Sequence, residues 1–316
     1  MNLQLTSGSF TVAVVGPVVK EPFSELMGVE FFPTLKSFME KSSGFDVLVY
    51  RGEDKLDDAF FALAKSLKLV VKPAVGVDNI DLQAAEKFNV KIRNVPSGST
   101  VSVAEFTICA IISLLRKFPQ AHTSTKRGEW RKSDFHGLEL NGKTVGVIGL
   151  GRIGMGVAER LKVFGVNLVG FDPYLPAERF NGIKQMNCVD DLLKASDIIT
   201  VHIPLENSTR NLINSENLKL VKKGALLVNT SRGEIVEEKA LIDAVKSGVL
   251  GGVALDVFPQ EPLEKCELHE LDNVILTPHI AASTVDAQLR ISQEVVAIIS
   301  EFQSMGEVVA IPTQKN

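Results

Sequence analysis

The sequence contains few cysteines and no excess of either charge. Its three cysteines, Cys109, Cys188 and Cys266, lie far apart and form no CxxC pair. A sparse, odd set of this kind predicts neither a disulfide framework nor a zinc site, so we expect no bound metal and a reducing compartment. Lys and Arg total 34 against 38 Asp and Glu, which gives a net charge of −4. This balance argues against a nucleic acid or an anionic membrane as a partner.

Long hydrophobic runs are also missing. The most apolar stretch, Thr107–Leu115, is flanked by Glu105 and Arg116 and is far shorter than the roughly 20 residues of a membrane-spanning helix. The first ten residues, MNLQLTSGSF, lack the basic start and apolar run of a secretory signal. We therefore expect a cytoplasmic protein, and at roughly 150 residues per domain the 316 residues predict two domains.

In the first third of the chain, short apolar runs alternate with helical patterns. Strands rich in β-branched residues are expected at Thr11–Val15, Val47–Tyr50, Leu69–Lys72 and Lys91–Val95. Helices are expected from Asp57 to Leu67 and from Asp81 to Phe88, because Asp is a good N-cap. Strand, helix and strand in this order predict a parallel sheet with right-handed crossovers.

A linker of small polar residues is expected at Pro96–Thr100, before a helix at Val101–Phe118 that is apolar almost all round. This helix must be covered on most faces, either at a domain or subunit interface or in an ordinary core. Six further strands are expected, at Thr144–Ile148, Asn167–Phe171, Ile198–His202, Ala225–Asn229, Gly252–Leu255 and Val274–Leu276. The last helix, about Val285 to Phe302, is expected to return to the first domain.

The predicted fold class is therefore α/β, with two doubly wound parallel-sheet domains and a cleft between them that closes on substrate. Residues 98–284 are expected to form a Rossmann-type dinucleotide-binding domain. Residues 1–97 are expected to form a flavodoxin-like substrate domain, completed by residues 285–316.

The strongest local signal is Gly149-Leu-Gly151-Arg-Ile-Gly154. A GxGxxG pattern alone is weak, but here a strand precedes it, a helix follows it, and the unit has about the 30 residues of a dinucleotide-binding βαβ motif. Gly149 allows the tight turn, Gly151 lets the backbone approach a pyrophosphate, and Gly154 lets helix and strand pack closely. Free N–H groups at the start of the helix would bind the diphosphate. A glycine-rich turn without a ligand is the less favoured interpretation.

The acidic residue that follows this motif selects the cofactor. Asp172 lies 18 residues past Gly154 at the end of the second strand, where a carboxylate accepts hydrogen bonds from ribose hydroxyls. A carboxylate there repels a 2′-phosphate, and the next residues, Pro173 and Tyr174, supply no cation to offset it. We therefore expect NAD rather than NADP.

Three side chains at predicted strand ends suit the oxidation of a secondary alcohol, in which a hydride leaves and a base removes the hydroxyl proton. His279 is the candidate base because its ordinary pKa of about 6.5 lies near working pH. Glu261 is the candidate carboxylate that orients the imidazole. Arg232 would hold a substrate carboxylate bidentately. Each alone could equally be a surface charge or a helix cap, so only the set supports an active site.

Seven motifs together resemble the D-isomer-specific 2-hydroxyacid dehydrogenases, and among them most closely the phosphoglycerate dehydrogenases. The resemblance runs from about Val47 to Ile299. The motifs are VGVDNID (75–81), SVAEFT (102–107), GLGRIG (149–154) with FDP (171–173), HIPLENSTRNLI (202–213), LVNTSRGEIVEEKAL (227–241), ALDVFPQEPL (254–263) and TPHIAAST (277–284).

The resemblance implies roles for individual residues. It implies that Arg232 binds substrate and that Glu261 and His279 form the acid–base pair. Substrate contacts are implied at Arg51, Lys72, Val75, Gly76, Arg232 and His279. NAD contacts are implied at Gly149, Gly151, Arg152, Ile153, Gly154, Asp172, His202, Pro204, Thr209, Thr230, Ser231, Asp256 and Ala281.

The resemblance further implies an NAD-dependent oxidation of 3-phosphoglycerate to 3-phosphohydroxypyruvate, the first step of serine synthesis, by a homodimer. The sequence departs from the family at Lys72-Pro73-Ala74, where Arg-Ala-Gly is common, at Ser99 and at Ala281, and Gly52 follows Arg51 where Ser is usual. A glyoxylate, hydroxypyruvate or D-lactate type reductase therefore stays open as an alternative. An NAD-sensing corepressor-like binding protein is a more remote one. We also expect no serine-responsive regulatory domain at the C-terminal end of this sequence.

Overall fold

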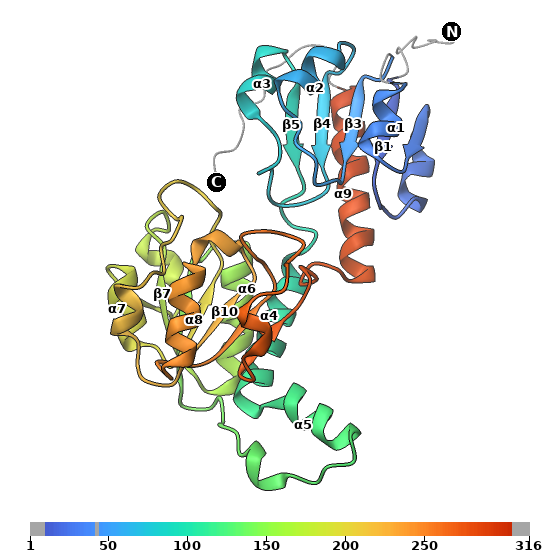
Figure 1. The fold of residues 1–316 in the computed structure, drawn as a ribbon. Helices are drawn as coiled ribbons and strands as arrows, with labels where there is room; N and C mark the ends of the chain where they lie inside the picture. The colour runs from blue at the N-terminus through green and yellow to red at the C-terminus, as the bar shows by residue number, and fades with distance from the viewer. Residues whose placement is uncertain (1–9, 42–43, 305–316) are drawn as a thin grey trace. The chain divides into compact units, whose positions relative to one another are not determined.

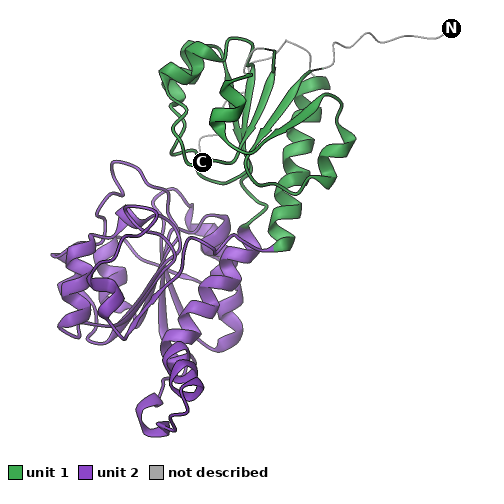
Figure 2. Cartoon of the chain, turned by 45° about the vertical axis from the view of Figure 1, so that its right-hand side comes forward, with its two compact units in different colours: residues 1–99, 285–316 green, residues 100–284 purple. Residues whose placement is uncertain are grey.

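The structure is a computed structural model in which residues 10–41 and 44–304 are described. The chain divides into two compact units, residues 1–99 with 285–316 and residues 100–284 (Figures 1 and 2). Each unit is built on its own parallel sheet. Within the described ranges, no helix is both long and apolar enough to cross a membrane.

The first unit contains a five-stranded parallel sheet within the described residues, in the order β2-β1-β3-β4-β5. Its strands are β1 (Val12–Val15), β2 (Val29–Phe32), β3 (Val47–Tyr50), β4 (Leu69–Lys72) and β5 (Lys91–Asn94). Its helices are η1 (Glu21–Glu25), α1 (Leu35–Met39), α2 (Asp58–Leu63), α3 (Leu82–Lys87) and α9 (Val285–Ser304). This strand order is that of flavodoxin-like folds.

Helices cover both faces of this sheet. Helices α1, α2 and α3 contribute Phe38, Phe61 and Ala84 to the core on one face. Helices η1 and α9 contribute Phe23 and Val295 to the core on the other face. Asp57 and Asp81 accept hydrogen bonds from the third residue of α2 and of α3, as expected of N-caps.

The second unit contains a seven-stranded parallel sheet in the order β12-β11-β10-β9-β6-β7-β8, counted over its described residues. Its strands are β6 (Thr144–Ile148), β7 (Asn167–Phe171), β8 (Lys184–Gln185), β9 (Ile198–Val201), β10 (Ala225–Asn229), β11 (Leu250–Leu255) and β12 (Val274–Leu276). Its helices are α4 (Thr100–Arg116), α5 (Phe118–Lys126), α6 (Arg152–Leu161), α7 (Val189–Ala195) and α8 (Glu238–Lys246). Short 3₁₀ turns complete it at η2 (Lys132–Phe135), η3 (Lys162–Phe164), η4 (Ala177–Phe180), η5 (Asn217–Leu220), η6 (Gly233–Ile235) and η7 (Glu267–Glu270).

Helices also cover both faces of the second sheet, which is therefore doubly wound as predicted. Residues of α4 and α6, such as Ile111 and Leu161, form the core on one face. Residues of α7 and α8, such as Leu192 and Leu241, form the core on the other. Strand β6 pairs with β7 on one side and with β9 on the other. The strand order reverses there, so β6 and β9 flank the switch point at which such folds bind ligands.

Several details of the predicted elements are wrong, among them the helix expected from Asp57 to Leu67, which ends at Leu63. The first sheet has the additional strand β2, and the second has the additional edge strand β8, so the seven strands replace the expected six. The strand expected to reach His202 ends at Val201. The helix expected at Val101–Phe118 ends at Arg116, because Lys117 is left-handed (φ 50°) and a separate helix, α5, begins before Pro119.

Candidate active site

The glycine loop lies at the switch point of the second sheet, between β6 and α6. Gly149 has φ +86°, and a β-carbon there would lie 2.6 Å from the carbonyl oxygen of His202. A β-carbon on Gly154 would lie 1.9 Å from the carbonyl oxygen of Gly149. By contrast, a β-carbon on Gly151 would have no neighbour within 4 Å. Two glycines therefore serve backbone packing, and the third keeps open a space at the N-terminus of a ten-residue helix.

Asp172 follows β7 and faces this loop. One oxygen of its carboxylate accepts a hydrogen bond from the Leu150 N–H (2.8 Å), and the other accepts one from the Tyr174 N–H (2.9 Å). The carboxylate is therefore held in a fixed orientation beside the glycine turn. Of the two residues after Gly151 that were predicted to contact cofactor, Arg152 is exposed and Ile153 is half-buried.

The segment after β9 carries three further predicted cofactor residues. The His202 ring bonds through Nε2 to Oγ1 of the fully buried Thr200 (2.8 Å). Burial lowers the pKa of His202 to about 3, so its imidazole is neutral at physiological pH. The Thr209 hydroxyl donates to the carbonyl oxygen of Pro204 (2.7 Å) and accepts from the Glu206 N–H, which closes the loop on itself.

The proposed catalytic residues lie in the loops that follow three neighbouring strands. Arg232 follows β10, Glu261 follows β11 and His279 follows β12, and these strands are adjacent in the sheet. His279 Nδ1 lies 2.8 Å from Glu261 Oε2. The other oxygen, Glu261 Oε1, accepts the Phe258 N–H (2.9 Å). The His279 side chain is 50% exposed, so its imidazole is anchored at one nitrogen and open to solvent.

Asp256 fixes the backbone around His279, which has φ 53°. It is 1% exposed, and one carboxylate oxygen accepts the Thr277 hydroxyl (2.7 Å) and the Ile280 N–H (2.8 Å). The other oxygen accepts the N–H of Ala281 (2.7 Å). A left-handed residue other than glycine costs about 1–3 kcal/mol and persists only where its surroundings hold it. These three bonds provide that restraint on either side of His279.

The turn that carries Arg232 is in contact with the turn that carries Glu261. A β-carbon on Gly233 would lie 2.0 Å from the carbonyl carbon of Phe258 and 2.3 Å from the nitrogen of Pro259. The Arg232 guanidinium donates to the carbonyl oxygen of Ser231 (2.7 Å). The hydroxyl of Thr230, the residue before Ser231, lies 3.2 Å from the hydroxyl of Thr107 in α4. The second unit therefore brings the loops of Arg232, Glu261 and His279 together.

The remaining predicted substrate residues lie in the first unit, at the carboxyl ends of β3 and β4. Arg51 is half-buried and donates to Oε1 of Gln288 in α9, and burial lowers the pKa of its guanidinium. Lys72 is buried, donates to the carbonyl oxygen of Gly52 (2.9 Å) and lies 5.1 Å from the centre of the Tyr50 ring.

The loop that contains Val75 and Gly76 follows β4 in the same unit. The carbonyl oxygen of Val75 accepts a hydrogen bond from the side chain of Asn94 (2.6 Å). This bond ties the loop to the end of β5. Among the described residues, no group of His, Cys, Asp and Glu has the geometry of a metal site.

Several residues that shape these loops were not predicted from the sequence. Asn229 forms hydrogen bonds with Ser231 and Arg232. Gln288 accepts a hydrogen bond from Arg51, and Thr277 donates one to Asp256. Asn229 and Thr277 belong to the quoted motifs NTSRG and TPH, so a signal was present, but a neutral side chain does not suggest acid–base chemistry. Gln288 could not be found from sequence, because its partner is 237 residues away.

The fold and the glycine loop define a Rossmann-type nucleotide-binding protein with a second α/β unit. Residues 108–281 match the family model described as D-isomer specific 2-hydroxyacid dehydrogenase, NAD binding domain, and the chain belongs to this family. The matched region is thus the NAD-binding domain of the family.

Individual relatives agree with this assignment. The chain is 45% identical to D-3-phosphoglycerate dehydrogenase of Methanocaldococcus jannaschii over 81% of its length and 49% of that protein. It is 38% identical to hydroxypyruvate reductase of Thermotoga maritima over 94% of its length and 99% of that protein. The chain spans about half the length of the phosphoglycerate dehydrogenases it matches.

A solved structure shows the same fold along nearly the whole chain. D-lactate dehydrogenase of Aquifex aeolicus, complexed with NAD and lactic acid, aligns with a TM-score of 0.84 at 30% identity, covering 96% of this chain and all of that one. The prediction of two parallel-sheet α/β domains and the predicted family are therefore confirmed.

Proposed function

We propose that this chain catalyses the NAD-dependent interconversion of a D-2-hydroxy acid and its 2-oxo acid, with 3-phosphoglycerate and 3-phosphohydroxypyruvate as the preferred pair. The observation that carries the proposal is the 2.8 Å bond between His279 and Glu261, on a turn in contact with the Arg232 loop. A base, a carboxylate that orients it and a guanidinium are the groups that alcohol oxidation on a carboxylic acid requires.

Each group has a defined task. His279 takes the C2 hydroxyl proton through Nε2, because Nδ1 faces Glu261. The Glu261 carboxylate stabilises the imidazolium that forms, and the Phe258 N–H keeps that carboxylate in place. Arg232 binds the substrate carboxylate and polarises the reacting oxygen. In the reverse direction His279 returns the proton to the oxygen of the 2-oxo acid.

The residues around the glycine loop fit NAD. A β-carbon on Gly151 would fill the open space next to the first turn of α6, where a pyrophosphate would be bound by backbone N–H groups. The Asp172 carboxylate would accept hydrogen bonds from the ribose hydroxyls and repel a 2′-phosphate. Bound NAD supplies the acceptor for the hydride that leaves C2.

The preference for a phosphorylated acid rests on Arg51. Its guanidinium is partly removed from water, and its hydrogen-bond partner, Gln288, is a neutral amide rather than a carboxylate. A desolvated guanidinium paired in this way favours an anionic ligand. We assign it to the terminal phosphate, and the backbone around Val75 and Gly76 to the substrate carboxylate.

The proposal extends to domain roles and partners. Residues 98–284 would bind the dinucleotide, and residues 1–97 with 285–316 the substrate. A homodimer is supported by apolar side chains on and beside α5, where Trp130 is 87% and Phe118 63% exposed. A cytoplasmic location is supported by three cysteines that are all free.

A hydroxypyruvate reductase is the second candidate. The Thermotoga maritima protein of that name matches this chain over 99% of its own length, whereas the phosphoglycerate dehydrogenases match over about half of theirs. Under this alternative Arg51 would bind no phosphate, and the same Arg232, Glu261 and His279 would act on a smaller acid.

Initial rates of NADH oxidation with a panel of 2-oxo acids test the proposal. The panel contains 3-phosphohydroxypyruvate, hydroxypyruvate, glyoxylate and pyruvate. We expect the highest kcat/KM for the phosphorylated acid and a loss of that preference in Arg51→Met. A higher kcat/KM for hydroxypyruvate would establish the reductase instead. Tight NADH binding without turnover of any acid would refute the enzymatic proposal.

A further inference from the structure

We propose that Asn229 is a positioning residue that sets the orientation of Arg232, an inference that rests on the proposed function. Asn229 is the last residue of β10 and is 1% exposed. Its side-chain oxygen accepts the N–H (3.0 Å) and the hydroxyl (2.8 Å) of Ser231. Its side-chain NH₂ donates to the carbonyl oxygen of Arg232 itself (2.8 Å). One buried amide thus binds both backbone positions that determine where the guanidinium points.

This pattern of bonds requires an amide. The side chain must accept from two donors and donate to a carbonyl, which only Asn and Gln can do with one planar group. Aspartate has the same shape but no N–H, so it would place a negative oxygen against the Arg232 carbonyl. A buried polar group that loses its partner in this way is costly, and the turn would change its conformation to avoid the repulsion.

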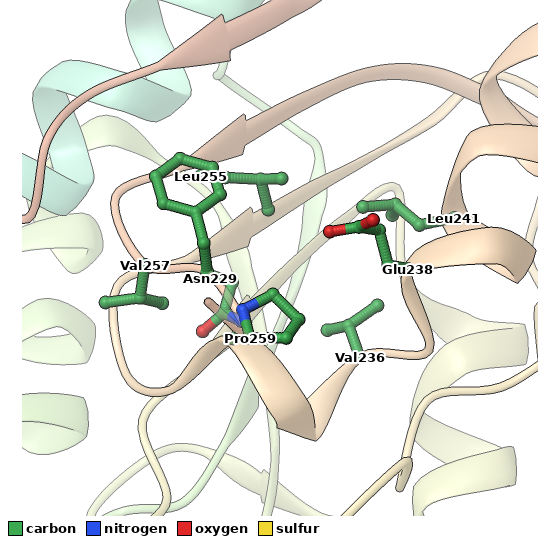
Figure 3. Close-up of a pocket in the computed structure, with 9 residues that line it drawn as sticks. Asn229, Val236, Glu238, Leu241, Leu255, Val257 and Pro259 are labelled. Atoms are coloured by element: carbon green, nitrogen blue, oxygen red, sulfur yellow. The ribbon is translucent and has the colours of Figure 1, made fainter. Parts of the chain in front are cut away.

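The backbone of Asn229 connects this turn to the neighbouring strand. Its carbonyl oxygen accepts the N–H of Asp256 (3.0 Å). The carboxylate of Asp256 in turn restrains the His279 loop. Asn229 also lines a small pocket with Gly233, Phe258 and Pro259, where the two turns meet (Figure 3). Asn229 therefore lies at the end of β10, paired with Leu255 at the end of β11, and its amide contacts the Arg232 turn.

The test is Asn229→Asp against a matched control, Asn217→Asp. Asn217 also shapes a turn through both ends of its amide, donating to the Leu212 carbonyl (2.8 Å) and accepting the Asn214 N–H (2.9 Å). It lies outside the proposed site. We expect Asn229→Asp to lower kcat/KM for the best 2-oxo acid by about 10²-fold, because a displacement of about 1 Å costs that much, with most of the loss in KM. The pH profile should not move, and Asn217→Asp should keep the wild-type kcat/KM.

A double-mutant cycle with Arg232→Lys separates positioning from general damage. If Asn229 acts through Arg232, Asn229→Asp should cost only a few-fold in the Arg232→Lys background, since the guanidinium it orients is gone. Asn229→Ser, which carries no charge, provides a second variant if the aspartate fails to fold. Equal costs in both backgrounds would overturn the inference.

Failure of the proposed function and failure of the Asn229 role give different results. A wild-type chain that binds NADH but reduces no 2-oxo acid would refute that function, and the role of Asn229 would be refuted with it. A wild-type chain that turns over while Asn229→Asp matches Asn217→Asp would refute the role of Asn229 alone.

Discussion

Replacing Gly233 with alanine should damage the proposed substrate site and leave the cofactor site intact. Gly233 is buried, and its backbone contacts that of Phe258, whose N–H holds Glu261. A β-carbon at residue 233 would lie 2.0 Å from the Phe258 carbonyl carbon and 2.3 Å from the Pro259 nitrogen. Both neighbours are backbone atoms, so the methyl group can be accommodated only if the Arg232 and Glu261 turns move apart.

The size of the effect follows from that geometry. Carbon atoms pack at about 3.5–4.0 Å, so the two turns must separate by about 1.5 Å. Overpacking of this kind costs about 1–3 kcal/mol, which lowers the Tm of a unit of this size by about 2–12 °C. Misplacement by about 1 Å can cost 10²-fold in rate, so we expect kcat/KM to fall by at least about 10²-fold.

Two other glycines of the same unit provide matched controls. A β-carbon on Gly156 in α6 would have only ordinary contacts of 3.5–3.8 Å, with Arg160 and with Thr100 and Ala104 of α4. Gly156→Ala should therefore leave kinetics unchanged and raise stability by about 0.4–1 kcal/mol. A β-carbon on Gly151 would enter open space beside the glycine loop. Gly151→Ala should therefore weaken NADH binding while the Tm of the apo-protein stays unchanged.

The assay combines thermal unfolding, NADH binding by fluorescence and steady-state kinetics on all three variants. The expected result is that Gly233→Ala binds NADH normally and loses turnover, whereas Gly151→Ala loses NADH affinity first. Normal kcat/KM in Gly233→Ala would show that the contact between the two turns does not hold Arg232 and Glu261 in their working geometry.

Three further predictions concern side chains away from this contact. Because the pKa of His202 is depressed to about 3 when folded, the unfolded chain binds the extra proton between pH 6.5 and 3, and stability should fall as pH drops through that window by up to about 1.4 kcal/mol per pH unit. Urea unfolding at pH 7 and pH 5 should show a smaller loss in His202→Gln, and an equal loss would contradict the assignment. Asp172→Ser combined with Tyr174→Arg should raise the NADPH to NADH ratio of kcat/KM; an unchanged ratio would mean that the carboxylate does not face the ribose. Gln288→Glu should place a carboxylate on Arg51 and lower the preference for 3-phosphohydroxypyruvate over hydroxypyruvate by about tenfold or more, whereas a preserved preference would place the phosphate elsewhere.

The elements that the sequence predicts well are those with a strong local signal. Asp57 and Asp81 cap their helices as expected, and the apolar runs form the central strands of both sheets. The two missed strands lie at sheet edges. β8 has only two residues, both exposed, and β2 is mostly half-buried, so neither shows the continuous apolar run of a buried strand.

The helix boundary at Lys117 was missed for a different reason. The apolar pattern continues through Phe118, but Pro119 favours a new helical start there, and Lys117 takes the left-handed conformation between the two helices. Periodicity reports which face is buried and does not report such a break.

The candidate site was predictable where it depends on charge and chemistry. The sequence singles out Arg232, Glu261 and His279, and the structure places the last two 2.8 Å apart. The sequence does not reveal which backbone groups hold these side chains. The contact of Gly233 with Phe258 and the bonds of Asn229 depend on how two adjacent strands end, which no local pattern encodes.

Asp256 shows the same limit. Its motif implies a cofactor contact, and that role stays a prediction. In the structure its two oxygens accept three hydrogen bonds from Thr277, Ile280 and Ala281. A buried carboxylate with these partners restrains the loop that carries the imidazole, a task that becomes visible only in three dimensions.

The most direct measurement is the kcat/KM of His279→Ala for 3-phosphohydroxypyruvate, with the NADH Kd of the same variant determined in parallel. If this imidazole transfers the proton, kcat/KM falls by at least about 10²–10⁴-fold while NADH binds as tightly as in wild type. Near-normal turnover in His279→Ala would contradict the proposal that this imidazole transfers the proton.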